Sequence, residues 1–364
     1  MEKKIWEDCL FLEGECQIKE YFKKRHRILL IMGNGFDPRQ CRILERLKSV
    51  VCDLTVFLVN YDEKATIRDD LRNESRSKKN YEQFQKICSD IRYSELSVPL
   101  YHGSNTKKTL VISESVRAAF TQEIISEYED IAIDISAMPR AVGFSIIKRL
   151  IDLKVESQRI HILVCENSKY DDIIKPVIVE DSAEFLPGFN TFSMSMEQDN
   201  DDTVWLPILG LQEESAFNII ANYLKPIEIC PVLPFPSVDI RRGENILRSC
   251  GNVLFQEHNV EKRNIIYVPE NYPFLVYQKL YETVMYYEKA FQIDSSRTQK
   301  YAFSSQSSKL MDIGVLLAMI ELGKKEIKVG LVVIENRGYN VAEYYPEEYE
   351  TMYCLCLDDN MFNW

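Results

Sequence analysis

Several signatures that would assign a reaction at once are missing from this sequence. The four histidines, at positions 26, 102, 161 and 258, show neither the HxH nor the HExxH spacing of zinc hydrolases. The GxSxG turn of serine hydrolases and the GxxxxGK(S/T) phosphate loop are also absent. The longest apolar runs, such as residues 28–32 and 329–334, are far too short to span a bilayer. These absences argue against both classes of hydrolase and against a membrane protein.

The net charge and the cysteines indicate the cellular compartment of the protein, but they do not indicate a reaction. The chain of 364 residues carries a net charge of -12, which argues against a general affinity for nucleic acid. Acidic residues interrupt the first 16 positions, so these positions lack the apolar core of a signal peptide. The ten cysteines include no CxxC pair, and several lie in strand-like runs, which is typical of buried thiols in a reducing compartment. We therefore expect a cytoplasmic protein.

Only one pair of cysteines is close in the sequence. Cys354 and Cys356 are separated by a single residue, and no histidine lies near them along the chain. Zinc sites usually combine such cysteines with further cysteines or histidines at a regular spacing. From this pattern we predict no metal site.

The apolar pattern predicts the fold class. Short β-branched runs, each followed by an amphipathic helical stretch, predict an α/β protein with a doubly wound, mainly parallel, Rossmann-like sheet and helices on both of its faces. Continuous apolar character marks parallel, central strands, which we expect near residues 27–33, 131–136, 160–165, 204–209 and 227–233.

The same pattern suggests how the chain is divided. We expect an N-terminal extension over residues 1–25, an α/β domain over 26–250 and a C-terminal part over 251–364 that continues the same sheet. The acidic residues of 190–202 have no apolar period, so this segment should be mobile or exposed, as a lid or as a passive loop.

The run RILLIMGNGFDPRQ (27–40) reads as a strand, a glycine turn and a helix start. Gly33 and Gly35 can take positive φ, and Asp37 can cap a helix whose first turn holds Pro38. Pro38 stands where the dinucleotide fingerprint needs its third glycine. One interpretation is a tight corner and a helix cap. The other is anion binding at the helix start by the residues Gly33, Asn34, Gly35, Asp37 and Arg39.

Three more strand ends carry polar residues just ahead of a helix. Each could serve capping or a salt bridge, or could bind a phosphate. These candidate residues are Asp134, Ser136 and Arg140 in the second cluster, Arg241 and Arg242 in the third, and Ser307, Ser308 and Lys309 in the fourth. Because ligands of doubly wound folds bind at the carboxyl edge of the sheet, we predict that one cleft gathers Gly33, Arg39, Ser136, Arg140, Arg242, Ser308 and Lys309.

Two resemblances to known proteins rest on short stretches. Residues 33–37, Gly-Asn-Gly-Phe-Asp, resemble the start of the AbiH family of phage abortive-infection proteins, whereas Pro38 and Arg39 depart from that pattern. The pieces GFDPR, DISAMPR, LPGF, PFPSVDIRR and SSKLMDIGVLLA resemble uncharacterised α/β proteins from prokaryotic conflict and defence loci. This resemblance implies a cytoplasmic defence protein and transfers no catalytic residue.

Two functional hypotheses follow from these residues. In the first, a prokaryotic antiviral-defence component binds a phosphorylated or nucleotide-like small molecule at the carboxyl edge of its sheet. In the second, the chain is a non-catalytic subunit that binds a protein partner encoded in the same defence operon. The sequence assigns neither a catalytic residue nor a cofactor.

Overall fold

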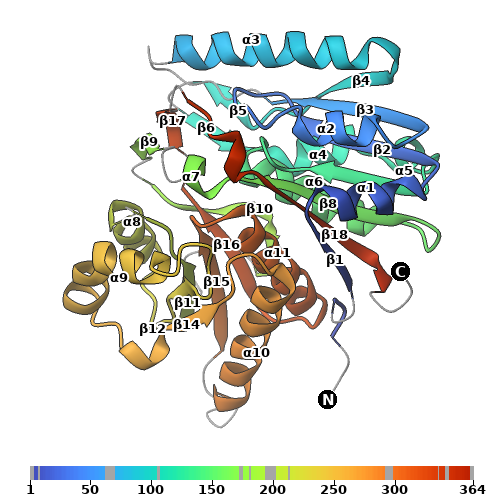
Figure 1. Ribbon diagram of the computed structural model, residues 1–364. Coiled ribbons are helices and arrows are strands. Elements are labelled where there is room, and N and C mark those ends of the chain that lie inside the picture. The colour runs from blue at the N-terminus through green and yellow to red at the C-terminus, as the bar shows by residue number, and fades with distance from the viewer. Residues whose placement is uncertain are drawn as a thin grey trace. The chain divides into compact units, whose positions relative to one another are not determined.

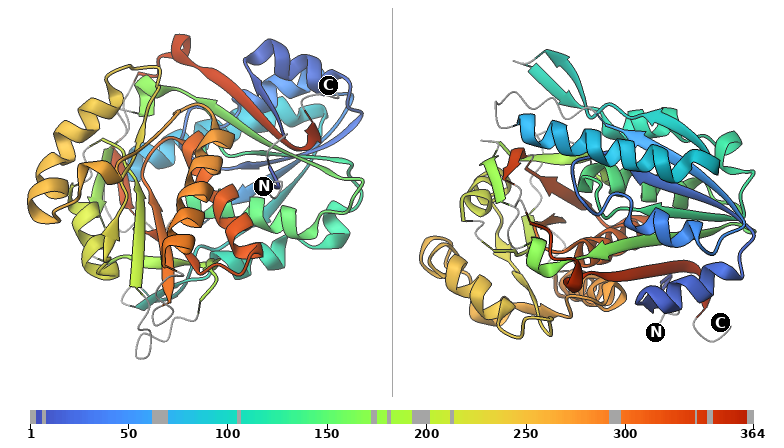
Figure 2. Two further views of the ribbon diagram at one scale, coloured as in Figure 1. Left: turned by 90° about the horizontal axis from the view of Figure 1, so that it is seen from below. Right: turned by 45° about the horizontal axis from the view of Figure 1, so that its top comes forward.

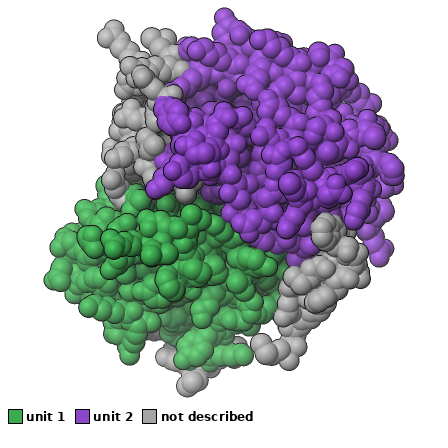
Figure 3. All heavy atoms as spheres, viewed as in Figure 1, with its two compact units in different colours: residues 1–7, 175–339 green, residues 8–174, 340–364 purple. Residues whose placement is uncertain are grey.

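The chain forms two compact units, which Figure 3 shows in green and purple. Unit 1 comprises Met1–Glu7 and Lys175–Tyr339, and unit 2 comprises Asp8–Ile174 and Asn340–Trp364. The computed structural model describes residues 4–6, 9–61, 70–104, 107–171, 175–179, 182–192, 202–211, 214–291, 298–334, 336–340 and 344–360. Unit 2 is therefore discontinuous, because its last strand follows the whole of the main segment of unit 1.

Unit 2 is built on a seven-stranded sheet (Figure 1). The strand order is β1 (Cys9–Glu13), β18 (Thr351–Asn360), β8 (Arg159–Glu166), β7 (Asp130–Asp134), β2 (Arg27–Gly33), β3 (Asp53–Asn60) and β4 (Arg92–Ser97). The five strands from β8 to β4 are parallel, and β18 runs antiparallel to both β8 and β1. Residues 28–32 of β2 are at most 1% exposed, as a strand covered on both faces requires.

Helices cover both faces of this sheet. The helices α1 (Glu15–Lys23) and α2 (Arg42–Lys48), in blue, lie on one face in the left panel of Figure 2, and α4 (Ile112–Ala119) and α6 (Arg140–Leu153), in green, lie on the other. The first face also receives Phe84 of α3 (Asp70–Ile87). Smaller elements are α5 (Gln122–Ile125), α7 (Ser168–Asp171) and the hairpin of β5 (Tyr101–Ser104) and β6 (Lys107–Leu110).

Unit 1 has its own mainly parallel sheet. The strand order is β10 (Glu184–Asn190), β16 (Val329–Val333), β15 (Gln299–Ser305), β11 (Asp202–Ile208), β13 (Val232–Pro234) and β14 (Ile266–Val268), with β12 (Glu228–Ile229) also paired to β11. Only the pairing of β10 with β16 is antiparallel among these described strands. A separate ribbon joins β9 (Lys175–Val179) to β17 (Asn336–Asn340).

The helices of unit 1 also form two layers. One face of the sheet packs against α8 (Glu214–Leu224), α9 (Arg242–Asn252) and the π-helical turn Val253–Glu257, with Trp205 of β11 in the middle of that cluster. On the other side, α10 (Pro273–Phe291) and α11 (Lys309–Lys324) pack against each other and against β15. Twelve of the 16 residues of α11 are buried, which explains why its sequence is apolar all round.

The two sheets share one order of parallel strands. In each sheet, three strands that follow one another along the chain are also neighbours in the sheet. They are β2, β3 and β4 in unit 2, and β11, β13 and β14 in unit 1. The next two strands, β7 and β8 or β15 and β16, are added on the other side of the first. In each sheet an antiparallel strand pairs with the last of these, but β18 follows the parallel strands of unit 2 in the chain, whereas β10 precedes those of unit 1. The fold thus contains the same order of five parallel strands twice, although the sequence has no visible internal repeat.

The predicted fold class is confirmed, and the expected strands are parallel, although residues 227–233 form two short strands, β12 and β13, of which β12 pairs only with β11 among the described strands. The C-terminal part continues a sheet that begins before residue 250, as expected, because β15 pairs with β11. The predicted division differs from the observed one because residues 26–250 contribute strands to both sheets and β18 joins the sheet of unit 2. Residues 9–23 form β1 and α1 of unit 2 and are not an extension. Of the acidic segment 190–202, residues 193–201 lie outside the described residues.

Gly314 tests the packing of α10 on α11. A Cβ atom at this position would lie 2.8 Å from the Pro273 carbonyl oxygen and 2.5 Å from Val276 Cβ. We therefore expect Gly314→Ala to lower the free energy of unfolding by about 1–3 kcal/mol, although alanine is the better helix former. Denaturant unfolding followed by the fluorescence of the buried Trp205 measures this effect. The matched control is Gly251→Ala in α9, where the added Cβ meets only Phe255 at 3.9 Å; an equal loss there would contradict the packing argument.

Candidate functional site

Each sheet has one point where the chain changes direction, and the candidate residues follow the strands that flank it. In unit 2 this switch point lies between β2 and β7, and in unit 1 it lies between β11 and β15. The loops that leave two such strands diverge, and ligands of doubly wound folds bind in the crevice between them. β2 ends at Gly33, in the glycine turn, and β7 ends at Asp134, with Ser136 two residues beyond. β15 ends at Ser305, within the run of serines at positions 304, 305, 307 and 308, which we call the serine run. Only Arg241 and Arg242, after β13, come from a neighbouring strand.

The glycine turn of unit 2 is closed by its own side chains. Gln40 accepts a hydrogen bond from the Gly35 amide (2.8 Å), and the Asn34 side chain donates to Asn60 (2.8 Å). Neither Gly33 nor Gly35 has a positive φ, so the turn does not use the conformational freedom that glycine offers. Glycine is required here because Tyr61 lies against the turn: a Cβ on Gly35 would be 2.5 Å from Tyr61 Oη. The Tyr61 hydroxyl also donates to the Ala137 carbonyl oxygen (3.1 Å), so this ring links the loop after β2 to the loop after β7.

Arg39 is held by carboxylates of the same unit. Its guanidinium donates from Nε and Nη2 to both oxygens of Asp37 (2.9 and 2.7 Å), and Nη1 lies 2.9 Å from Asp171. Burial alone would lower the pKa of Arg39, but Asp171 and Asp37 raise it well above its ordinary value. Since Arg39 is only 4% exposed, its charge is already matched by two acids. The structure thus favours the structural interpretation of this residue.

Asp37 does not cap α2, as the sequence suggested. The helix begins at Arg42, four residues after Pro38, and its N-cap is Cys41. The Asp37 carboxylate instead accepts from the Arg39 amide (2.9 Å), which forms an Asx turn. The signal was ambiguous because an Asx turn and an N-cap use the same residue types.

At the end of β7, Ser136 and Asp134 tie two strands together. Asp134 accepts hydrogen bonds from the amide and the hydroxyl of Ser136 (2.9 and 2.5 Å), and that hydroxyl accepts from the Cys165 amide of β8 (2.7 Å). Both residues are buried. Arg140 begins α6 directly after Pro139, as predicted, and its side chain is half-buried.

In unit 1, the serine run forms the end of β15 and the start of α11, and its hydroxyl groups bond to neighbouring residues of that unit. Ser308 is the N-cap of α11 and accepts from the Met311 amide (3.4 Å), and Lys309 is the first helical residue. Ser304 accepts from the Trp205 indole (3.0 Å), and the Ser305 hydroxyl donates to the buried Asp312. Ser305, Ser308 and Lys309 are half-buried, whereas Ser307 is buried.

The third cluster is divided between a surface residue and a buried ion pair. Arg241 is exposed and forms the N-cap of α9. Arg242 Nε lies 2.7 Å from Glu270 Oε1, and both residues are buried. The salt-bridge interpretation of Arg242 is therefore the one that the structure supports.

The candidate residues thus fall into two groups, one in each unit. Unit 2 contains Gly33, Asn34, Gly35, Asp37, Arg39, Asp134, Ser136 and Arg140, and unit 1 contains Arg241, Arg242, Ser307, Ser308 and Lys309. Within each unit they lie at the carboxyl ends of the parallel strands. Their convergence on a single cleft stays a prediction.

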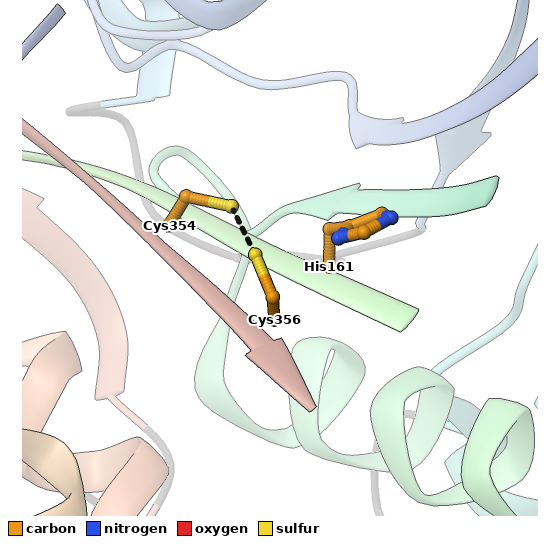
Figure 4. Close-up of side chains that lie close together, drawn as sticks. All are labelled: His161, Cys354 and Cys356. Carbon is orange, nitrogen blue, oxygen red and sulfur yellow. Dashed lines mark hydrogen bonds between the residues drawn. The ribbon is translucent and has the colours of Figure 1, made fainter. Parts of the chain in front are cut away.

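A further cluster, which lies apart from the four strand-end clusters and which the sequence did not indicate, lies inside unit 2. Figure 4 shows His161 of β8 beside Cys354 and Cys356 of β18. His161 pairs directly with Cys356 across the two strands, and the two sulfur atoms are 3.7 Å apart. The expectation that no histidine accompanies these cysteines therefore holds along the sequence but not in space. All ten cysteines are free thiols, and eight of them are buried, as expected.

The opposite side of His161 faces a cluster of charges. Asp130 Oδ1 lies 2.8 Å from His161 Nε2, and Arg159 donates two hydrogen bonds of 2.7 Å to the Asp130 carboxylate. Burial opposes the charged forms, but Asp130 and Cys356 raise the pKa of His161 to about 9. Cys354 and His161 lower the pKa of Cys356 to about 6 despite its burial. His161 and Cys356 therefore each stabilise the charged form of the other.

Comparisons with known proteins add little. No protein-family model matches the chain, and no curated protein matches its sequence. A tRNA methyltransferase, TrmK of B. subtilis, is 10% identical over 46% of this chain, which spans 59% of that protein's length, with a TM-score of 0.21. The cytoplasmic domain of a prokaryotic cation chloride cotransporter is 13% identical over 86% of this chain and 98% of its own, also with a TM-score of 0.21. Similarities this low carry no argument about function.

Among the residues that the structure describes, no helix combines the length and the apolar character that are needed to cross a bilayer.

Arg39 should matter for stability rather than for ligand affinity. Arg39→Met leaves the buried Asp37 carboxylate without its cation, so we expect a loss of about 2–4 kcal/mol in the free energy of unfolding. Hydrogen exchange of the β2 and β7 amides measures this loss within unit 2. The exposed Arg117 of α4 offers a control, since Arg117→Met should change exchange by less than about 0.5 kcal/mol. Equal protection in both variants would contradict the ion-pair assignment.

Asp130 makes unit 2 sensitive to acid. Burial would raise its pKa, but Arg159 and His161 lower it below the ordinary value. The interactions of the Asp130 carboxylate with Arg159 and His161 therefore stabilise the fold above the pKa of an unfolded aspartate, about 3.9. This contribution to stability is lost as the pH falls further and the carboxylate becomes protonated. We expect Asp130→Asn to reduce the free energy of unfolding by about 2–4 kcal/mol at pH 7, with a smaller difference at pH 3.

Unfolding curves at both pH values, with the exposed Asp152→Asn variant as control, test this dependence. A difference between Asp130→Asn and the original protein that stays constant with pH would show that the carboxylate charge is not the cause.

Proposed function

We propose that this chain binds a phosphorylated or nucleotide-like ligand at the carboxyl edge of the unit 1 sheet, at the switch point between β11 and β15. The observation that carries this proposal is the position of the serine run: it lies at the end of a central parallel strand and opens a long helix. A helix start presents backbone N–H groups and the positive end of the helix dipole, which favour an anion.

The side chains of this loop suit a phosphate and the sugar attached to it. Lys309 supplies a positive charge at the helix start, and Ser308 lies beside it as the N-cap. The Ser305 hydroxyl is oriented by the Asp312 carboxylate, so its oxygen lone pairs face away from that acid. Serine hydroxyls and an ammonium group form an anion site without a Walker loop.

The equivalent point of unit 2 supports ligand binding less well. There the Gly35 amide donates to Gln40, Arg39 is matched by two acids, and Tyr61 links the two loops. The polar groups that a phosphate would need are already used within the unit. We assign a structural role to the glycine turn, and we assign the ligand to unit 1, where the 16-residue helix α11 begins just after a central strand, whereas α2 has only seven residues.

The biological setting that we propose is prokaryotic antiviral defence in the cytoplasm. It is supported by the resemblance of five short pieces to proteins of conflict and defence loci. Two of these pieces, PFPSVDIRR and SSKLMDIGVLLA, contain the candidate residues of unit 1.

One observation favours the second candidate function, a non-catalytic partner-binding subunit. The segment between β13 and α9 exposes Phe235 (57%), Val238 (71%) and Ile240 (81%), and Tyr267 of β14 beside Phe235 is 51% exposed. Exposed apolar residues that gather in one place are typical of protein interaction surfaces. Co-purification of this chain with the product of a neighbouring gene, lost on Ile240→Asp, would favour this alternative.

The ligand proposal is tested on Lys309. Isothermal titration calorimetry with ATP, GTP, AMP, GMP and inorganic phosphate identifies the best probe for the original protein. Lys309→Ala should then weaken binding of that probe by about 1–3 kcal/mol, which is typical of charge-assisted hydrogen bonds. The fold should be unaffected, because the side chain is only half-buried.

Lys289→Ala provides the matched control, since it removes the same charge from the exposed last turn of α10. It should leave affinity unchanged. No binding of any probe, or equal weakening in the two variants, would contradict a phosphate site at the start of α11.

A further inference from the structure

The buried cluster of His161, Cys354 and Cys356 has the composition of a metal site. The imidazole nitrogen and the two sulfur atoms all lie within 4.8 Å of one another, and the three side chains are 0% exposed. Two sulfurs bound to one metal ion at bond lengths near 2.3 Å lie about 3.8–4.0 Å apart. The observed 3.7 Å is close to this separation. The alternation of a strand places Cys354 and Cys356 on the same face, which is why one intervening residue suffices.

The histidine is oriented as a metal ligand usually is. A ligating imidazole typically donates its second ring N–H to a carboxylate, which fixes the ring and leaves the first nitrogen free to bind. Asp130 occupies that position at Nε2, held in turn by Arg159. The remaining nitrogen, Nδ1, is buried and has no hydrogen-bond partner of normal geometry in the described part of the chain.

The surroundings exclude water. The rings of Tyr21 and Phe22 from α1 contact the His161 ring edge-on, with centroids 5.5 and 5.3 Å away. Both are at most 1% exposed, and so is Leu163, the cross-strand neighbour of Cys354. Thiolate ligands in such a shell select soft ions, chiefly Cu⁺ and Zn²⁺.

The number of protein ligands in the cluster distinguishes between Zn²⁺ and Cu⁺. Structural zinc is almost always bound by four protein ligands. Among the described histidine, cysteine, aspartate and glutamate side chains, only three form this cluster. We propose that His161 Nδ1, Cys354 Sγ and Cys356 Sγ form a buried, three-coordinate site for a single Cu⁺ ion in unit 2.

Binding requires the ligands in their deprotonated forms. The sulfur-bound protons of Cys354 and Cys356 and any proton on His161 Nδ1 leave to solvent when the ion binds, and Asp130 keeps the proton of Nε2 in its hydrogen bond. The bound ion would link β8 to β18, two strands whose paired residues lie almost two hundred positions apart in the sequence. This site is separate from the ligand site proposed in unit 1.

The experiment loads the full-length chain with copper. The protein is expressed in copper-supplemented medium, purified without oxygen under reducing conditions, and analysed for copper by mass spectrometry and for copper ligands by X-ray absorption. We expect one Cu⁺ per chain, bound by two sulfurs and one nitrogen. Cys354→Ala and Cys356→Ala should each lower copper loading at least tenfold, whereas Cys88→Ala, which removes a buried thiol outside the cluster, should retain it.

Three results would overturn the proposal. The first is a protein that carries no copper, and the second is one that loads zinc in preference to copper when both are supplied. The third is an absorption spectrum with sulfur ligands alone, which excludes His161. Circular dichroism checks that the alanine variants fold, and if either does not, the spectrum of the original protein decides the matter without them.

Discussion

The arrangement of this protein depends on a constraint of parallel sheets: every strand must start from the same edge, so the chain crosses over a face of the sheet between strands. When the direction of winding reverses, the loops on either side of the first strand separate. This happens between β2 and β7 and again between β11 and β15. The polar residues that follow these strands lie where backbone N–H groups and helix starts are most accessible. The order of the strands in a sheet therefore determines where a site can lie, and the residues of the loops at that point determine its chemistry.

The same order of parallel strands is followed by different loops in the two units. In unit 2, Arg39 pairs with Asp37 inside the loop after β2, and the Tyr61 hydroxyl, from the loop after β3, donates to the Ala137 carbonyl oxygen after β7. A buried guanidinium between two acids stabilises one loop conformation, because any other would leave a charge unpaired. In unit 1 the corresponding loop carries serines and a half-buried lysine at the start of α11. The same order of parallel strands therefore carries loops of different composition in the two units.

Local sequence patterns predicted the elements but not their partners. The runs 27–33 and 204–209 are recognisable because a strand buried on both faces must be apolar throughout. No local pattern shows which strands share a sheet, so the division at residue 250 could not be corrected from the sequence. The same holds for the candidate sites: Arg39 meets Asp171, and His161 meets Cys356, only through tertiary pairing. Asp37 shows a different difficulty, since turns and helix caps use the same side chain.

The position of β18 has a consequence for how the chain acquires its structure during synthesis. This strand lies between β1 and β8, and β1 pairs with no other strand among those described. During synthesis β1 therefore cannot pair until β18 has been made, and by then the main segment of unit 1 is already complete. Until then β8 exposes an unpaired edge, which is the kind of surface that recruits other chains. Truncation at the C-terminus would leave this protein permanently in that nascent state.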